Sequence, residues 1–230
     1  ASAFGPGQMG INLQAVLEQH RYPSFDLGLA QGLGGGLGHQ LQGLFRHMRY
    51  TDSILGNLHQ YDFDEHQLAL KWSLLGGPSS RAGVAPMIGW SRFTETVREG
   101  ASARSSLRRT YRWGSLISSA AGPGGSRLIV TARTLQEVES DGLVVAMVAG
   151  VELPAIGRLT ALGDVGSFVR RPAARVPPWP SRRPWAAGVR VAMDHGAFLL
   201  YWSNTRGTTV PDSLSAEPLT FVNLRWALEY

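Results

Sequence analysis

Cysteine is absent from the 230-residue chain, which excludes disulfide bonds, thiol chemistry and the acylated cysteine of a lipoprotein anchor. The chain also lacks any run of about 18 uncharged apolar residues, so a transmembrane helix is excluded. Lysine is scarce beside arginine, and 22 basic against 17 acidic residues give a formal net charge of +5. The arginines concentrate in residues 98–112 and 170–183, which indicates charged loop tips and not a nucleic-acid-binding face.

Glycine and proline are abundant, with 28 and 13 residues, but they fall between alternating apolar runs and not in one low-complexity tract. That distribution argues against disorder. No break in composition divides the chain, so residues 1–230 are expected to form a single domain. The mean hydropathy is close to zero, as it is in strands whose apolar and polar residues alternate.

The last stretch, residues 222–230, has the clearest alternation. Every second residue from Val222 to Tyr230 is apolar, whereas the residues between them include Asn223, Arg225 and Glu229. Because side chains of a strand alternate between its two faces, one face is apolar and ends in an aromatic residue, and the other is polar. This division is typical of a strand with lipid on one side and water on the other.

Residues 222–230 resemble the closing C-terminal strand of bacterial outer-membrane β-barrels, which typically ends in an aromatic residue, most often Phe. The final residue here is Tyr230. The resemblance implies an all-β fold, a transmembrane antiparallel up-and-down β-barrel in the outer membrane.

Alternation predicts about twelve strands along the chain. The runs are residues 11–18, 25–33, 38–46, 65–74, 84–93, 107–118, 128–133, 143–151, 159–166, 185–194, 197–204 and 222–230. Both faces of the run at 197–204 are apolar, so its sides are not assigned. Every second connection is short and contains Gly or Pro, as at 34–36 and 122–125, whereas four of the others are long and polar. These four are residues 50–60, 94–106, 170–184 and 205–218.

Short turns on one rim and longer loops on the other are typical of a membrane barrel whose termini lie on the short-turn, periplasmic side. Residues 1–10 would form a periplasmic N-terminal segment, and the closing strand would pair with the strand that begins near Ile11. The chain starts Ala1-Ser2-Ala3, without a basic and then apolar leader, and is interpreted as a mature form whose signal peptide has been removed.

If the apolar faces contact lipid, the opposite rows line the lumen. The candidate lumen-lining residues are Gln14, Glu18, Gln40, Gln42, Arg46, Glu65, Lys71, Arg108, Arg112, Arg133, Glu152, Asp164, Arg190, Asp194, Asn223, Arg225 and Glu229. Two interpretations remain open: a salt-bridge network that fills a narrow barrel, or a small polar channel with a bias toward anions. The size of a barrel of about twelve strands favours a filled or constricted lumen.

Aromatic residues near strand ends or on apolar faces would form belts at the lipid headgroups. The candidates for these lipid-facing positions are Trp72, Trp90, Trp113, Trp185, Trp226 and Tyr230.

An outer-membrane hydrolase is the main competing class, and it would need a Ser or Asp next to a His held by a third group. The six histidines show no such spacing, so no enzyme activity, cofactor or metal is expected. His59 and His66 flank three acidic residues, but a solvated acidic loop is the favoured interpretation, because neighbours such as Asp64 and Glu65 would point to opposite faces.

One segment resembles a family of outer-membrane β-barrels of unknown function. The stretch S-N-T-R-G-T-T-V-P-D follows an apolar strand near the end of the chain, and F-D-L-G-L-A-Q-G-L-G and L-Q-G-L-F-R stand near its start. The family-like residues of the first stretch are Ser203, Asn204, Thr205, Gly207, Thr208, Thr209 and Asp212. The resemblance implies a fold and a location, and we expect these residues to form a hydrogen-bonded loop near the last hairpin.

The sequence therefore predicts either a porin-like channel or constricted pore for small solutes, or a structural barrel that docks a partner protein in a larger complex. Outer-membrane lipid and lipopolysaccharide are the expected surroundings. A protein partner would be held by the loops at 94–106 and 170–184 or at the periplasmic face.

Overall fold

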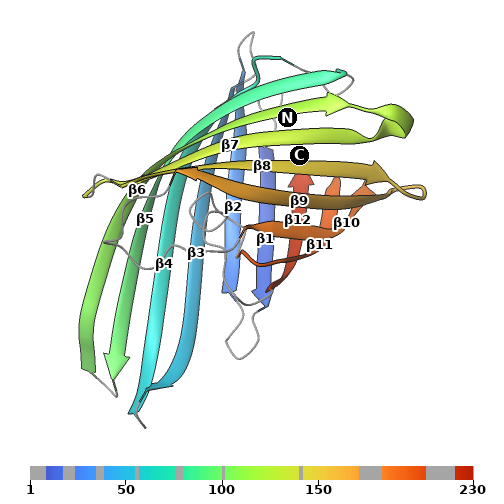
Figure 1. The fold of residues 1–230 in the computed structure, drawn as a ribbon. Coiled ribbons are helices and arrows are strands. Elements are labelled where there is room, and N and C mark those ends of the chain that lie inside the picture. The colour runs from blue at the N-terminus through green and yellow to red at the C-terminus, as the bar shows by residue number, and fades with distance from the viewer. Residues whose placement is uncertain are drawn as a thin grey trace.

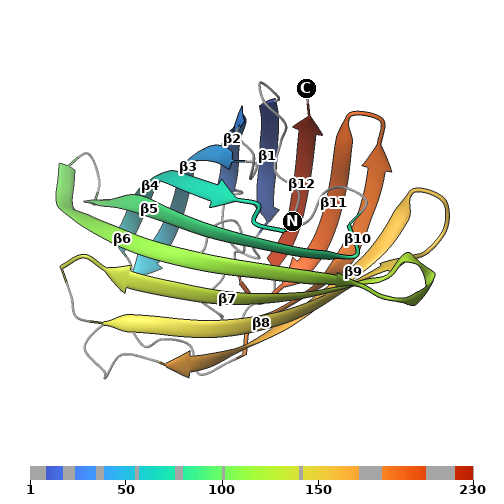
Figure 2. The same ribbon diagram turned by 90° about the horizontal axis from the view of Figure 1, so that it is seen from above.

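The chain forms one closed antiparallel β-barrel of twelve strands (Figures 1 and 2). The computed structural model describes residues 9–17, 24–34, 39–54, 57–75, 80–99, 102–139, 142–170, 183–205 and 221–229. The strands are β1 (Met9–Leu17), β2 (Ser24–Gly34), β3 (His39–Ile54), β4 (Asn57–Trp72), β5 (Ala82–Glu99), β6 (Ser102–Ala121), β7 (Arg127–Glu137), β8 (Leu143–Pro154), β9 (Leu159–Arg170), β10 (Trp185–Met193), β11 (Gly196–Ser203) and β12 (Phe221–Glu229). This architecture confirms the predicted twelve-stranded barrel.

Each strand pairs with its neighbours along the chain, and the last strand pairs with the first. In the β1–β12 seam, Gly10 lies opposite Glu229 and Leu17 opposite Val222, so β1 begins at the rim where β12 ends. Figure 2 shows the two strands side by side. Closure satisfies the backbone hydrogen bonds of both strands, which hydrocarbon could not do for an open edge.

The rim at which β1 begins carries tight turns. A 3-10 turn, η1 (Pro123–Gly125), joins β6 to β7, with Gly124 at φ 63° and Gly125 at φ 77°. Only glycine adopts such angles without strain, which confirms the turn predicted at residues 122–125. In the described part of the chain, no helix is long and apolar enough to cross a membrane.

Strand length differs greatly around the ring. β3 and β4 have 16 residues each, and β5 and β6 have 18 and 20, whereas β10, β11 and β12 have 9, 8 and 9. A tilted strand needs only about 9–11 residues to cross a bilayer. The four long strands therefore extend beyond the others at the rim opposite the termini, as Figure 1 shows.

The prediction of long loops at residues 50–60 and 94–106 is wrong. β3 continues to Ile54 before β4 begins at Asn57, and β5 continues to Glu99 before β6 begins at Ser102. These segments are polar because they belong to the extended part of the strands, where neither face has to be apolar. Residues 171–182 and 206–220 of the other two predicted loops lie outside the described residues.

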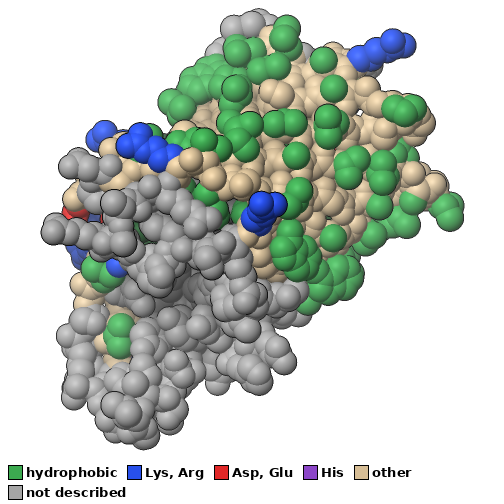
Figure 3. All heavy atoms as spheres, in the orientation of Figure 1, with side chains coloured by type: hydrophobic (Ala, Val, Ile, Leu, Met, Phe, Trp, Pro, Cys, Tyr) green, Lys and Arg blue, Asp and Glu red, His purple; other side chains and the backbone are tan. Residues whose placement is uncertain are grey.

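The outer face of the barrel is apolar around most of the ring. Large hydrophobic side chains are exposed in outward rows, including Leu13, Leu68, Trp90, Leu128 and Trp226. Figure 3 shows hydrophobic side chains spread over one such face, with few charged ones among them. β11 follows the same rule, because Phe198 and Trp202 are exposed, whereas Tyr201, one position along the strand, is half-buried.

Candidate functional site

One row of residues that are paired from strand to strand carries charged residues around much of the barrel interior. Its members are Arg190, Leu199, Arg225, Gln14, Asp26, Arg46, Glu65, Phe93 and Arg109, each directly opposite the next on the neighbouring strand. Because opposed residues share a face, the whole rung belongs to the inner face. Its central part alternates Asp26, Arg46 and Glu65, and Glu65 is fully buried. We call this row the charged rung.

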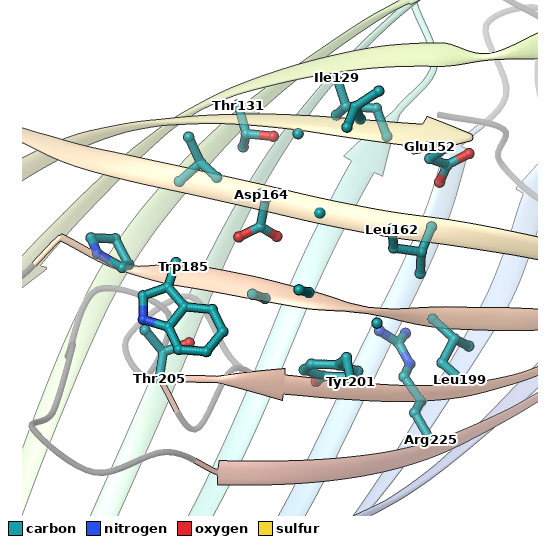
Figure 4. A pocket seen from close by; sticks show the side chains of 18 of the residues that line it. Ile129, Thr131, Glu152, Leu162, Asp164, Trp185, Leu199, Tyr201, Thr205 and Arg225 are labelled. Atoms are coloured by element: carbon teal, nitrogen blue, oxygen red, sulfur yellow. The ribbon is translucent and has the colours of Figure 1, made fainter.

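A cavity of about 270 Å³ lies on the inner wall where β7 to β12 approach one another. Its charged lining residues are Arg133, Glu152, Asp164 and Arg225, two of each sign. Figure 4 shows the side chains of Glu152, Asp164 and Arg225 projecting from different strands into the same space. Asp164 lies within the electrostatic reach of Arg133 and accepts a backbone hydrogen bond from Ala186. We call this space the polar cavity.

An ion pair connects the polar cavity to the charged rung. Both terminal nitrogens of Arg190 contact Glu152, with Nη1–Oε1 and Nη2–Oε2 distances of 3.3 Å each. This two-point geometry fixes the orientation of both side chains. Arg225 and Arg133 lie on the cavity wall on other strands, and Asp164 lies within the electrostatic reach of Arg133.

The inner wall formed by β4 to β9 is packed with apolar side chains, and we call these the inner apolar cluster. The cluster consists of Ala69, Trp113, Leu135, Val144 and Ala146, with Met87, Tyr111 and Phe168 packed against it. Trp113 is only 5 % exposed, and its indole Nε1–H donates to Ser91 Oγ at 3.1 Å. Gln67 Nε2 donates to the same oxygen at 3.0 Å. This part of the interior resembles a protein core, so it narrows the lumen.

Two aromatic residues on the inner wall lie opposite glycines of the neighbouring strand, and the ring of one of them, Trp113, rests on its glycine. Trp113 lies opposite Gly89, and Tyr201 lies opposite Gly188. A Cβ at Gly89 would overlap the Trp113 ring, and one at Gly188 would overlap Tyr201 and a backbone oxygen of β11. A glycine paired with an aromatic residue of the next strand indicates that the aromatic side chain faces inward here. The sequence alone does not reveal this pairing, because it depends on which residues of the two strands lie opposite each other.

Asn204 joins the end of β11 to the start of β10. Its Oδ1 accepts a hydrogen bond from the Trp185 backbone N–H at 2.8 Å, and its Nδ2 donates to the Arg183 carbonyl at 2.9 Å. Pro184, between these residues, is buried, and its carbonyl accepts a hydrogen bond from the Gly166 N–H at 2.7 Å. We call this arrangement the Asn204 clasp, and it holds the chain leaving the β9–β10 connection against β9 and β11.

The structure places the family-like residues only in part. Ser203, Asn204 and Thr205 are all buried, and the Ser203 hydroxyl donates to the Thr205 carbonyl. Thr205 also lines the polar cavity. Gly207, Thr208, Thr209 and Asp212 lie outside the described residues.

The predicted lumen residues fall into four groups, of which the last, three residues that do not face the lumen, is corrected below. Those whose side chains lie on the inner wall are Glu65, Lys71, Arg133, Glu152, Asp164, Arg190 and Arg225. Those placed in inner rows by their backbone register alone are Gln14, Gln40, Gln42, Arg46, Asn223 and Glu229. Glu18 lies outside the described residues.

Three predicted lumen residues are corrected. Arg112 lies opposite Trp90, which is 41 % exposed on the outer face, and Arg108 is in the same outward row of β6. Asp194 lies in the β10–β11 turn, where its carboxylate is 2.7 Å from Arg158 and both side chains are exposed. The alternation of β6 was assigned to the wrong sides, because its aromatic row packs inward and does not face lipid.

Trp113 is the matching correction among the predicted belt residues, since it is buried inside the barrel. Trp90 and Trp226 are exposed in outward rows. Trp185, at the start of β10, is paired with the exposed Val165 and is itself exposed, but it also lines the polar cavity (Figure 4). Trp72 is half-buried in the row of Leu68 and Leu70, which faces outward. Tyr230 lies outside the described residues.

The described side chains bring no histidine to the inner wall. His66 is exposed in an outward row, and His195 is exposed in the β10–β11 turn. Asp64 and Glu65 lie on opposite faces of β4, but this segment is a strand and not the predicted acidic loop. No group of three or more metal-ligating side chains occurs within the described ranges.

Comparison with solved structures identifies the class of fold as that of outer-membrane β-barrels. The translocator domain of the autotransporter NalP from Neisseria meningitidis superposes with a TM-score of 0.52 at 12% identity, over 99% of this chain and 89% of that one. KdgM porin gives a TM-score of 0.53 at 7% identity, over 96% of this chain and 98% of that one. No protein-family model and no curated protein matches the chain.

The transport unit of the autotransporter AIDA-I from Escherichia coli is a third similar structure, with a TM-score of 0.51 at 8% identity, over 97% of this chain and 89% of that one. At these identities the likeness shows the fold alone. The chain therefore has the fold shared by porins and by translocator barrels, and its own role has to be argued from its interior.

Proposed function

We propose that this protein is an outer-membrane β-barrel that forms a constricted pore for small polar solutes. The observation that carries the proposal is the polar cavity, which lies inside a closed barrel with an apolar exterior and is lined by both signs of charge. Such a lining replaces the hydration of a polar or charged solute. The inner apolar cluster narrows the passage from the opposite wall, which favours a small solute.

Arginines outnumber acids on the charged rung, which carries Arg190, Arg225, Arg46 and Arg109 against Asp26 and Glu65. Rings of arginine favour anions in a pore. We therefore propose that the pore prefers anions over cations of the same size.

The purified barrel is expected to give stepwise conductance in a planar lipid bilayer, with a reversal potential in a KCl gradient that shows chloride preference. The double variant Arg190→Gln/Arg225→Gln should lose most of this preference, because two lumen charges are removed. The control Arg81→Gln/Arg158→Gln removes two exposed charges near the turn rim and should leave the reversal potential unchanged. A barrel that never conducts would refute the pore.

The long strands support a second candidate, a structural barrel that docks a partner protein. β6 pairs with β5 as far as Ser102, but within the described residues its other edge pairs with β7 only from Tyr111 onward. Among the described residues, no strand pairs with this edge of β6 before Thr110, whose carbonyl accepts from the Val138 N–H, so another chain can add there by backbone hydrogen bonds. The docking site would be this edge and not the predicted loop at 94–106.

Because the chain has no cysteine, a single introduced one reports on such docking. Ser106→Cys stands on the exposed extension of β6. Labelled in intact cells with a maleimide that carries a photoreactive group and then irradiated, it should form a cross-linked adduct of higher mass if a partner docks there. Ser167→Cys, exposed on β9, is the control, and the same treatment should give it no such adduct. Equal cross-linking of both variants, or of neither, would contradict docking at this edge.

A further inference from the structure

Three arginines form an exposed cluster on the outer face of the barrel. Arg92 lies on β5, and Arg108 and Arg112 lie on β6, where the register pairs Arg92 with Thr110, the residue midway between them. All three are exposed. Diagonal neighbours on adjacent strands stand about 7–8 Å apart, so Arg92 is within reach of both of the others. We call the three residues the outer arginine cluster.

The outer arginine cluster lies at the edge of the apolar band. Trp90 pairs with Arg112 and with Leu68, and Leu68 and Ile88 are 54 % and 56 % exposed in the same band. An arginine at the middle of a bilayer costs roughly 2–4 kcal/mol, a cost that falls to near zero at the interface. The cluster therefore marks the level of the lipid headgroups, with Trp90 just on the hydrocarbon side.

The three arginines of the cluster outnumber the carboxylates beside them, since Asp64 is the one acidic residue among the described outward neighbours on β4 and β7. Among the residues that the structure describes, none makes an ion pair with Arg92, Arg108 or Arg112. On the β4 side of the cluster, Asp64 is the diagonal neighbour of Arg92 and shares the rung of Arg108 two strands away, but it makes its interactions with other residues. His66 shares the rung of Arg92. On the β7 side, the residue opposite Arg112 is the uncharged Gln136.

Three arginines this close repel one another unless an anion lies between them. Arginine binds phosphate, as it binds carboxylate, through two parallel N–H···O bonds that are stronger than hydrogen bonds between neutral groups. At headgroup level the available anions are lipid phosphates.

The surface beyond the cluster distinguishes between kinds of lipid. Above the apolar band, the outward rows of β5 and β6 carry Thr94, Thr96, Arg98, Ser106 and Thr110. This hydroxyl-rich wall continues past the level of the phosphates, where a phospholipid headgroup has ended but the sugars of a glycolipid continue. Hydroxyl and guanidinium groups both hydrogen-bond to sugars.

We propose that Arg92, Arg108 and Arg112 bind the phosphate groups of lipopolysaccharide in the outer leaflet, with the Thr- and Ser-bearing wall of β5 and β6 contacting its sugars. The inference rests on one part of the proposed function, namely that the barrel spans the outer membrane with its termini in the periplasm. It does not depend on conduction.

The test is the affinity of the purified, refolded barrel for lipopolysaccharide, measured by thermophoresis in detergent. The variant Arg92→Gln/Arg112→Gln is expected to bind at least about tenfold more weakly than the wild type, since two charge-assisted contacts are lost. The control Arg81→Gln/Arg158→Gln removes the same charge near the turn rim and should bind like the wild type. Equal loss in both variants, or loss in neither, would overturn the proposal.

Two further probes separate phosphate recognition from general attraction to anions. The wild type should bind lipopolysaccharide weakly once the phosphates of its lipid anchor are removed. Its affinity for this dephosphorylated form should be about that of the variant for intact lipopolysaccharide. Micelles containing phosphatidylglycerol should bind the wild type and the variant with similar, low affinity. Binding of phosphatidylglycerol as tight as that of lipopolysaccharide would refute a glycolipid site. A barrel that binds lipopolysaccharide as expected but never conducts would support this inference while refuting the pore.

Discussion

Replacing Trp113 with alanine is expected to lower the free energy of unfolding of the barrel by about 3–5 kcal/mol, the usual cost of deleting a buried tryptophan. The indole is 5 % exposed at the centre of the inner apolar cluster, and its Nε1–H is hydrogen-bonded to Ser91. Gln67 would still donate to Ser91, so most of the loss comes from the empty space and not from an unsatisfied hydroxyl. The space would also widen the lumen, so single-channel conductance should rise.

Urea titration of the barrel in lipid vesicles, followed by its heat-modifiable mobility on gels, measures the stability. Trp90→Ala is the matched control, because it removes the same side chain from the outer face, where we expect a loss of about 1 kcal/mol or less. Trp113→Phe should fall between the two, since it keeps most of the ring volume but loses the hydrogen bond. Equal destabilisation by Trp113→Ala and Trp90→Ala would contradict the inward placement of Trp113.

Replacing Asn204 with alanine is expected to destabilise the Asn204 clasp by about 2–4 kcal/mol, because it removes two part-buried hydrogen bonds and leaves their backbone groups without a protein partner. The Trp185 N–H loses its acceptor, and the Arg183 carbonyl loses its donor. The effect should be local, since the β10–β11 ladder itself is untouched.

Hydrogen exchange measured by mass spectrometry gives the local stability. A peptide containing Trp185 should exchange roughly thirtyfold faster or more in Asn204→Ala, which corresponds to about 2 kcal/mol. Ser126→Ala is the control, because Ser126 Oγ makes a similar side-chain bond to the Pro123 carbonyl, at 2.7 Å, but in an exposed turn. If exchange near Trp185 is unchanged in Asn204→Ala, the clasp does not hold this segment.

The parts of the fold that the sequence predicts well are those where lipid and the barrel interior impose opposite requirements on a strand. β12 is the clearest case, since its apolar row faces outward and Arg225 lies on the inner wall. β1 and β12 pair as predicted, because the register of a short strand with one apolar face has few alternatives. Tight turns are recognisable because Gly124 and Gly125 adopt angles that only glycine tolerates freely.

The errors fall on β6, where the rule that apolar residues face lipid fails twice. Near Arg108 the strand has passed beyond the apolar band, so an arginine can face outward without contacting hydrocarbon. Near Trp113 the interior is packed and not aqueous, so an aromatic residue can face inward. The first condition depends on how far the strand extends beyond the apolar band, and the second on which side chains of other strands fill the interior. The alternation of apolar and polar residues within one strand carries neither piece of information.

The same limit explains the two missed strand extensions. Residues 48–54, 57–64, 93–99 and 102–110 have no hydrocarbon on either side, so their sequence carries no apolar row and resembles a loop. They are ordered as strands because each pairs with a neighbour over its full length. Such pairing is a property of two segments together, and it explains why the outer arginine cluster emerges only from the structure.

The β1–β12 seam also orders the steps by which the barrel forms. The hairpin of β5 and β6 joins Glu99 to Ser102, whereas the seam joins Gly10 to Glu229, nearly the whole chain apart. Closing a long loop costs more entropy and proceeds more slowly than forming local pairs. The long hairpins therefore form early and the seam last, and until it closes β1 and β12 expose free edges that other chains could pair with. The pairing of the barrel most distant along the chain is thus the one that decides between a finished pore and an aggregate.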